Sequence, residues 1–253
     1  MRRQREEGWL RRLVPCERPA VRLVCFPHSG GSAIAFEQWA DALAPGVELL
    51  AVQYPGRGDR FGEELVCDVA ELAGHVVREL VGLPMSEHVL FGHSLGALLA
   101  YESAVLLRDM GREPEQLCVS ACLPPGHLEI RHLHQAPDDE FWDSLCALGG
   151  IDPAIAENEE LREMLAPALR SDLRAHATYE PASDTKRLSC PVRCYHGIGD
   201  PIVEEEQLSG WAKVTTGAFA LGVRPGGHFH LSTDPAVLVA EILDVQRGQG
   251  YGG

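Results

Sequence analysis

Residues 88–97 read HVLFGHSLGA, and this stretch decides the fold because it joins a strand pattern directly to a helical one. Its apolar start, His88–Phe91, predicts a short buried strand, and Leu95–Met110 predicts a long helix. Between them lies Gly92-His93-Ser94-Leu95-Gly96, which matches the pattern G-x-S-x-G. A strand before and a helix after are the context that this pattern requires at a nucleophilic serine.

The turn predicts a specific chemistry for Ser94. A sharp strand-to-helix turn strains the backbone of the serine and lifts its Oγ out of the sheet, and the flanking glycines leave room where a Cβ would collide. The N-terminus of the following helix favours developing negative charge. A glycine-flanked turn without chemistry is the alternative, and the candidate partners of Ser94 argue against it.

Further strands and helices alternate along the chain on both sides of this turn. Helices of ten or more residues between strands imply parallel pairing, with helices on both faces of the sheet, so the fold class is α/β. The predicted strands are Val21–Phe26, Val47–Tyr54, Leu117–Leu123, Val192–His196 and about 218–223; the predicted helices are Phe36–Leu43, Val69–Leu80, about 204–211 and about 235–245.

The alternation stops between residues 124 and 188, where two helical patterns follow each other without a strand. We interpret 1–253 as a single domain that carries a helical lid insertion over about 124–188. Phe141 and Trp142 belong to the apolar face of the first of these helices.

A serine hydroxyl is a weak nucleophile unless a base takes its proton. His228 is the favoured base because it lies in a glycine-rich loop between the last strand and the last helix, and His230 is its competitor. Asp200 directly follows a late strand and is the favoured partner for the imidazole; Asp184 and Asp234 follow no strand. The order Ser94, Asp200, His228 is the order of a hydrolase triad.

Acyl transfer also needs donors for the oxyanion. One is expected to be the backbone N–H of Leu95, the residue after the nucleophile. The second is expected from the small-residue loop after the first predicted strand, Phe26–Gly31, and we favour the N–H of Ser29 with Gly30 beside it. A plain Gly-Gly turn is the alternative for this loop.

Composition argues against several classes of function. The net charge is −15, which opposes binding to nucleic acid. No apolar run is long enough for a membrane span, and no apolar segment of a secretory signal follows the arginine-rich start, which we interpret as a frayed terminus. Without a signal the eight cysteines indicate reduced thiols in the cytoplasm rather than disulfides, and their spacing favours no metal site.

Four motifs together carry a family resemblance. They are, in order, RLVCFPHSGG at 22–31, YPGRGDR at 54–60, GHSLGA at 92–97 and PGGHF at 225–229. This combination resembles the stand-alone type II thioesterases of polyketide and nonribosomal peptide biosynthesis, within the α/β-hydrolase superfamily, over roughly residues 9–245. Leu95 and Ser29 stand where the family often has Met and Ala, which leaves their backbone roles intact.

The resemblance implies an editing enzyme. Such enzymes hydrolyse aberrant or stalled acyl groups from the phosphopantetheine arm of acyl or peptidyl carrier proteins, through an acyl-enzyme on the serine. It implies the catalytic residues Ser94, Asp200 and His228, and a lid whose apolar side chains, Phe141 and Trp142 among them, could line an acyl chamber. Ordinary packing of the helices on the sheet is the alternative for each of these side chains. Gly30 and Phe229 are the other expected substrate-binding residues. We expect no metal or organic cofactor, and a cytoplasmic monomer.

Three other functions stay open from the sequence. A general carboxylesterase or lipase would use the same residues on an oxygen ester, and a terminal product-releasing thioesterase would use them on a finished chain. A binding module with a hydrolase fold but no activity is the third, and the presence of all three triad residues argues against it. Carrier proteins are usually acidic, so docking would need local basic residues; the candidates are Arg57, Arg60, Arg131, Lys186 and Arg187.

Overall fold

The computed structural model describes residues 8–127, 132–147, 149, 151, 153–182 and 185–244. Within these residues seven strands form one sheet in the order β1-β3-β2-β4-β5-β6-β7, in which β1 is antiparallel to β3 and every other neighbouring pair is parallel. The strands are β1 (Leu10–Val14), β2 (Val21–Phe26), β3 (Val47–Val52), β4 (Glu87–His93), β5 (Gln116–Ser120), β6 (Val192–Gly197) and β7 (Phe219–Arg224).

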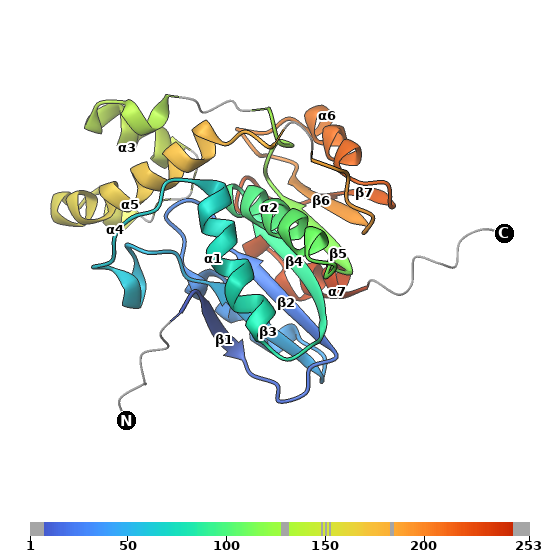
Figure 1. The fold of residues 1–253 in the computed structure, drawn as a ribbon. Helices are drawn as coiled ribbons and strands as arrows, with labels where there is room; N and C mark the ends of the chain where they lie inside the picture. The colour runs from blue at the N-terminus through green and yellow to red at the C-terminus, as the bar shows by residue number, and fades with distance from the viewer. Residues whose placement is uncertain are drawn as a thin grey trace.

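Helices cover both faces of the sheet, as the alternating pattern predicts (Figure 1). On one face α1 (Val69–Gly82) and α2 (Leu95–Asp109) pack with α6 (Glu205–Leu208) and η4 (Ser209–Val214) in the larger apolar core. On the other face η1 (Ala33–Ala42) packs against α7 (Pro235–Leu243) in a second core. The mostly parallel sheet with two covered faces confirms the predicted α/β class.

The helix predicted from Phe36 to Leu43 is a 3-10 helix, η1, that begins earlier, at Ala33. Phe36 and Trp39 are both fully buried and lie three residues apart, which is the repeat of a 3-10 helix. Their rings form edge contacts with Phe91 of β4. The short helices η2 (Gly58–Arg60) and η5 (His230–Ser232) are 3-10 helices as well.

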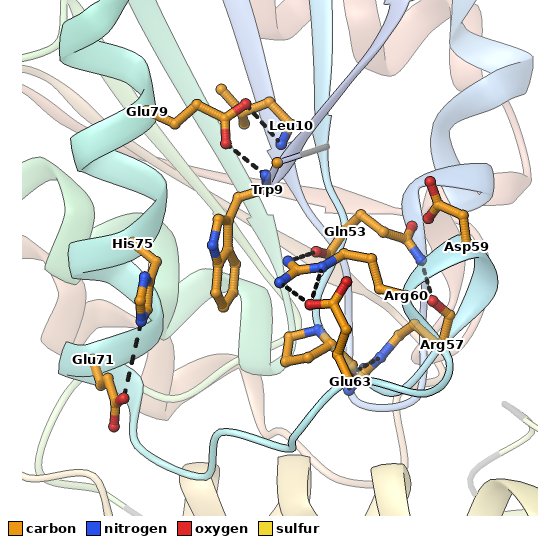
Figure 2. Close-up of polar contacts among 12 residues, drawn as sticks. Trp9, Leu10, Gln53, Arg57, Asp59, Arg60, Glu63, Glu71, His75 and Glu79 are labelled. Carbon is orange, nitrogen blue, oxygen red and sulfur yellow. Dashed lines mark hydrogen bonds and ion pairs between the residues drawn. The ribbon is translucent and has the colours of Figure 1, made fainter. Parts of the chain in front are cut away.

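The frayed terminus predicted for the arginine-rich start is wrong for residues 10–12, which form part of β1. Figure 2 shows how Glu79 of α1 accepts the backbone N–H groups of Trp9 and Leu10, at 2.5 and 3.3 Å. The indole of Trp9 lies between the guanidinium of Arg60 and the ring of His75. The basic residues of the strand are paired as well, because Arg11 binds Asp59 and Arg12 binds Glu48.

Between β5 and β6 the chain forms η3 (Leu133–Gln135), α3 (Asp138–Ala147), α4 (Pro153–Ala156) and α5 (Glu159–Thr178). Helices α3, α4 and α5 lie together at one end of the molecule (Figure 1). Their apolar side chains form a separate small core of Phe141, Trp142, Leu145, Leu169 and Leu173. This segment therefore has a core of its own, and α5 also packs against α2.

Candidate active site

Ser94 occupies the turn between β4 and α2 in a backbone conformation that side chains rarely adopt, with φ 54° and ψ −122°. A Cβ on Gly92 would lie 2.0 Å from the carbonyl oxygen of Gly96, and one on Gly96 would lie 2.1 Å from that of Phe26. Only glycine fits at either position. The N–H of Ser94 donates to the carbonyl of Ser120 at 2.8 Å, which fixes the turn to the neighbouring strand.

His228 and Asp200 lie side by side at the same edge of the sheet. Asp200 follows β6 and His228 follows β7, and His228 Nδ1 lies 2.9 Å from Asp200 Oδ2. The other carboxylate oxygen, Oδ1, accepts the N–H groups of Ile202 and Val203 at 2.9 and 3.4 Å. Burial acts to raise the pKa of Asp200, but the hydrogen bonds to the carboxylate outweigh it, so the pKa lies below its ordinary value.

Ser94 and His228 line one cavity. Its volume is about 20 Å³, room for about one water molecule. Its other walls come from the segment after β5, from the segment after Asp200 and from α5; they are Ala121, Cys122, Leu123, His127, His176, Ile202 and Val203. The structure thus brings together the predicted nucleophile Ser94, the predicted base His228 and its carboxylate partner Asp200, although they lie up to 134 residues apart in the sequence.

His176 is a residue of the site that the sequence analysis did not single out. The residue lies on α5, and its side chain lines the cavity with Ser94 and His228. Burial, with a smaller contribution from His228, lowers the pKa of His176 to about 4, so a neutral imidazole faces the cavity. No local pattern distinguishes this histidine, because its role depends on where α5 lies.

The predicted oxyanion donors are the backbone N–H groups of Leu95 and Ser29. Leu95 is the first residue of α2, where backbone N–H groups have no partner inside the helix. Among the described residues neither the N–H of Leu95 nor that of Ser29 donates to another group of the chain. The next N–H, that of Gly30, is instead taken by Asp172 Oδ2 at 2.7 Å.

The predicted substrate-binding residues fall into two groups. Phe141 and Trp142 are buried in the small core of α3 and α5 and do not line the cavity with Ser94, so the structure favours the packing alternative for them. The ring of Phe229 lies 5.1 Å from that of His228 and 4.9 Å from that of His28, next to the predicted base. Gly30 has φ +76° and lies under Leu169 of α5.

The competing candidates have other partners. His230 Nε2 lies 2.9 Å from Ser120 Oγ, which also contacts His93 Nδ1 at 3.0 Å, so this histidine belongs to a buried chain behind the site. Asp234 caps α7 by accepting the N–H of Val237. Asp184 lies outside the described residues.

The basic residues considered for docking do not form one exposed group. Arg57 is buried and paired with Asp172, and Arg60 is paired with Glu63. Arg131 lies outside the described residues.

A mostly parallel sheet in this order, with a strained serine on the turn after β4 and the Asp–His pair after β6 and β7, defines an α/β-hydrolase. The family model of the thioesterase domain matches residues 21–246. The chain therefore belongs to the thioesterase family and is a hydrolase that acts on thioesters.

Relatives with known names support this assignment. Over 245 residues the chain is 41% identical to the thioesterase PikA5 of Streptomyces venezuelae, covering 95% of this chain and 87% of that protein. It is 40% identical to a probable cadicidin biosynthesis thioesterase of Streptomyces griseus over 92% of this chain, and it spans 64% of the length of that protein. The solved structure of the type II thioesterase BorB from the borrelidin biosynthetic cluster superposes with a TM-score of 0.85 at 36% identity, covering 94% and 97% of the two chains.

No helix of the described residues has both the length and the apolar character that crossing a membrane requires.

Proposed function

We propose that this thioesterase removes stalled or aberrant acyl groups from the phosphopantetheine arm of carrier proteins in polyketide or nonribosomal peptide biosynthesis. One observation carries the catalytic part: the strained Ser94 shares a cavity with His228, whose Nδ1 is hydrogen-bonded to Asp200. The relatives named above, one of them from the borrelidin cluster, support the biosynthetic setting.

The proposed mechanism has two halves. His228 takes the proton of Ser94 Oγ while the oxygen attacks the thioester carbonyl; the C–S bond then breaks, and the pantetheine sulfur leaves with the proton from His228. In the second half His228 takes a proton from water, the hydroxide attacks the acyl-enzyme, and the proton returns to Ser94 Oγ as the acid leaves. Asp200 orients the imidazole and stabilises its charged form, and the N–H groups of Ser29 and Leu95 hold the oxyanion.

We further propose that the helices of residues 124–188 act as a lid on this single-domain enzyme. His127 and His176 of this segment form part of the wall of the cavity at Ser94, so movement of the segment would change access to the nucleophile. Amide hydrogen exchange measures this motion: exchange in α5 faster than in β4 and β5 supports a gate, and equal protection contradicts it.

The proposed partners are acyl-loaded carrier proteins. We propose that the enzyme binds them as a monomer in the cytoplasm. All eight cysteines, which all lie within the described residues, are free thiols. Light scattering on the purified protein measures the monomeric state, and a dimer mass contradicts it.

Mass spectrometry of several acyl-loaded carrier proteins after exposure to the enzyme tests the function. We expect the acyl mass to disappear and the free phosphopantetheine arm to remain, and we expect Ser94→Ala to lower the rate by at least about 10³-fold. Unchanged hydrolysis by Ser94→Ala would falsify the assignment of the nucleophile.

Comparing kcat/KM for an acyl-pantetheine thioester and an oxygen ester of equal chain length separates a thioesterase from a general carboxylesterase. We expect the thioester to be the better substrate. An oxygen ester that is hydrolysed better points to the carboxylesterase.

A further inference from the structure

The motif at residues 54–60 takes no part in the proposed chemistry, yet the structure ties it to the oxyanion loop, which we define as residues 27–33. The hydroxyl of Tyr54 donates to the carbonyl of Pro27 at 3.0 Å, and Gln53 Oε1 accepts the N–H of Ala33 at 2.9 Å. The segment that follows β3 therefore binds both ends of the oxyanion loop.

Arg57 continues this connection from the same segment. Gln53 Nε2 donates to the carbonyl of Arg57 at 2.9 Å, as Figure 2 shows, so the backbone of Arg57 is held in place. The guanidinium is buried with 6% of the residue exposed. It donates to both carboxylate oxygens of Asp172, with Arg57 Nη2 2.9 Å from Oδ1, and it also contacts the carbonyls of Pro55 and Gly31.

Asp172 comes from α5, the helix proposed as part of the lid, and only 1% of the residue is exposed. The oxygen that receives Arg57 Nη1, Oδ2, also accepts the N–H of Gly30 at 2.7 Å. One carboxylate thus joins three segments that are distant in the sequence: the lid helix, the oxyanion loop and the segment after β3.

The apolar neighbours of Asp172 on α5 pack against the oxyanion loop and against the segment after β3. A Cβ on Gly30 would lie 2.3 Å from Leu169 Cδ2, and one on Gly56 would lie 3.5 Å from Ala168 Cβ. Positions 168, 169 and 172 share one face of a helix, because they are spaced by three and four residues. This face of α5 therefore meets the oxyanion loop through close packing as well as through charge.

We propose that Asp172 and Arg57 form a clamp that positions the oxyanion loop, so that the N–H of Ser29 is aimed at the reacting carbonyl while α5 is seated. Both are positioning residues that act through the loop. This inference rests on the proposed function, because it takes Ser29 as a donor to the oxyanion.

Two physical effects follow from the clamp. Donors stabilise a transition state most when they are fixed before the reaction, and the hydrogen bond from Gly30 fixes the residue next to Ser29. A lone carboxylate this close to the loop would repel the oxyanion, and Arg57 offsets that charge. Movement of α5 away from the oxyanion loop would take the carboxylate of Asp172 with it, and the N–H of Ser29 would then no longer be held in position.

Steady-state kinetics of Arg57→Met, Asp172→Asn and the double variant test the clamp. The substrate is an acyl-pantetheine thioester that the wild-type enzyme hydrolyses, and the probe of the oxyanion hole is a trifluoromethyl ketone with the same acyl chain. Arg57→Met leaves the carboxylate unbalanced, so we expect kcat to fall by about 10- to 100-fold, a part of the ~10²–10³ that loss of a whole donor costs. We expect KM to change less than kcat.

Inhibition by the ketone and the kinetics of the double variant distinguish a loss of positioning of the oxyanion loop from a loss of folded protein. We expect Ki for the ketone to rise by the same factor as kcat falls, because both report binding of the tetrahedral oxyanion. Adding Asp172→Asn to Arg57→Met removes the unbalanced charge, so we expect it to restore part of kcat and of ketone affinity. Thermal unfolding of each variant shows that the rates refer to folded protein.

Asp138→Asn is the matched control, since Asp138 pairs with Arg170 on the same lid at 2.8 Å but is exposed. We expect it to keep wild-type kcat and Ki. Should Arg57→Met not fold, Asp172→Asn alone decides: it keeps nearly the same volume but loses the charge that holds Arg57, so we expect kcat to fall and Ki to rise. An effect no larger than that of Asp138→Asn overturns the clamp. Activity that survives in Ser94→Ala contradicts the proposed function instead.

Discussion

At the scale of single residues, the site depends on a tightly packed backbone turn around Ser94, in which a side chain at Gly92 or Gly96 would collide with neighbouring backbone atoms. Ser94 holds φ 54° because the turn from β4 to α2 is tight, and the strain persists because Ser120 and the surrounding strands fix it. The glycines at 92 and 96 are the condition for this turn rather than a source of flexibility.

Gly96→Ala tests this condition. The added methyl group would lie 2.1 Å from the carbonyl oxygen of Phe26 and 2.7 Å from that of Pro27, which are backbone atoms that cannot turn aside. We expect the free energy of unfolding to fall by about 3 kcal/mol or more, in the range of severe steric changes, with loss of hydrolysis. Urea denaturation measures the change. Gly74→Ala on α1 is the control, because its Cβ meets no atom within 4 Å, and we expect stability to be kept.

Asp200→Asn tests the orienting role proposed for the carboxylate. The amide keeps the volume but loses the charge and offers His228 Nδ1 a donor or a weaker acceptor. We expect kcat to fall by about 10⁴-fold, as in well-studied serine triads, with little change in KM. Steady-state hydrolysis of an acyl-pantetheine thioester measures it, and a fall below about tenfold contradicts the role.

At the scale of elements, two segments owe their position to partners distant in the chain. Strand β1 is held by Glu79 of α1, and the helix α5 is held to the oxyanion loop by Asp172. In both contacts a carboxylate, half-buried at Glu79 and buried at Asp172, accepts backbone N–H groups of a distant segment.

Glu79→Ala tests the attachment of β1. It removes the acceptor of the N–H groups of Trp9 and Leu10, so we expect the free energy of unfolding to fall by about 1–3 kcal/mol. Urea denaturation measures the loss. Glu71→Ala on the same helix is the control, because Glu71 is exposed and lies 3.9 Å from His75, as Figure 2 shows; we expect it to stay within about 0.5 kcal/mol. Equal effects of the two variants would contradict the attachment.

At the scale of the whole molecule, the interior holds several histidines in their neutral form. Burial is the main cause: it lowers the pKa of His28, His88, His176 and His230 to about 4 and that of His93 well below its ordinary value. Nearby charges add to the shift, among them His228 for His28 and Arg22 for His88. The folded state therefore resists protonation between pH 6.5 and 4.

Stability is expected to fall as the pH drops through this window. Below the ordinary pKa of about 6.5 the unfolded chain binds protons that the folded protein does not, so unfolding is favoured by up to about 1.4 kcal/mol per pH unit for each such histidine. Below pH 4 both states bind the proton, and this dependence ends. Calorimetry in buffers of different ionisation enthalpy at pH 5 measures the proton uptake on unfolding.

His88→Gln is the matched variant, because His88 lies at the far end of β4 from Ser94. We expect it to lower the uptake by about one proton. A thermal midpoint that does not change between pH 7 and 4.5 contradicts the account.

The fold was largely predictable because its signals are local. The strand at Val21–Phe26 is apolar except for Arg22, and α2 begins directly after Ser94 of the glycine–serine motif. Strand β1 was not predictable, since its two adjacent arginines, Arg11 and Arg12, look like part of a solvated terminus. In the structure its backbone pairs with β3, and its arginines pair with Asp59 and Glu48, 48 and 36 residues away.

By itself the sequence determined the class of fold and the three residues proposed for catalysis, because a nucleophile turn, a late strand followed by Asp and a glycine-rich loop with His are each encoded by neighbouring residues. Tertiary structure alone decided which face of α5 meets the site. It brought His176 to the cavity and Asp172 to Gly30 across 142 residues, and it turned Phe141 and Trp142 into a core of their own. The physical reason is that a helical pattern defines an apolar face but not the surface on which that face will pack.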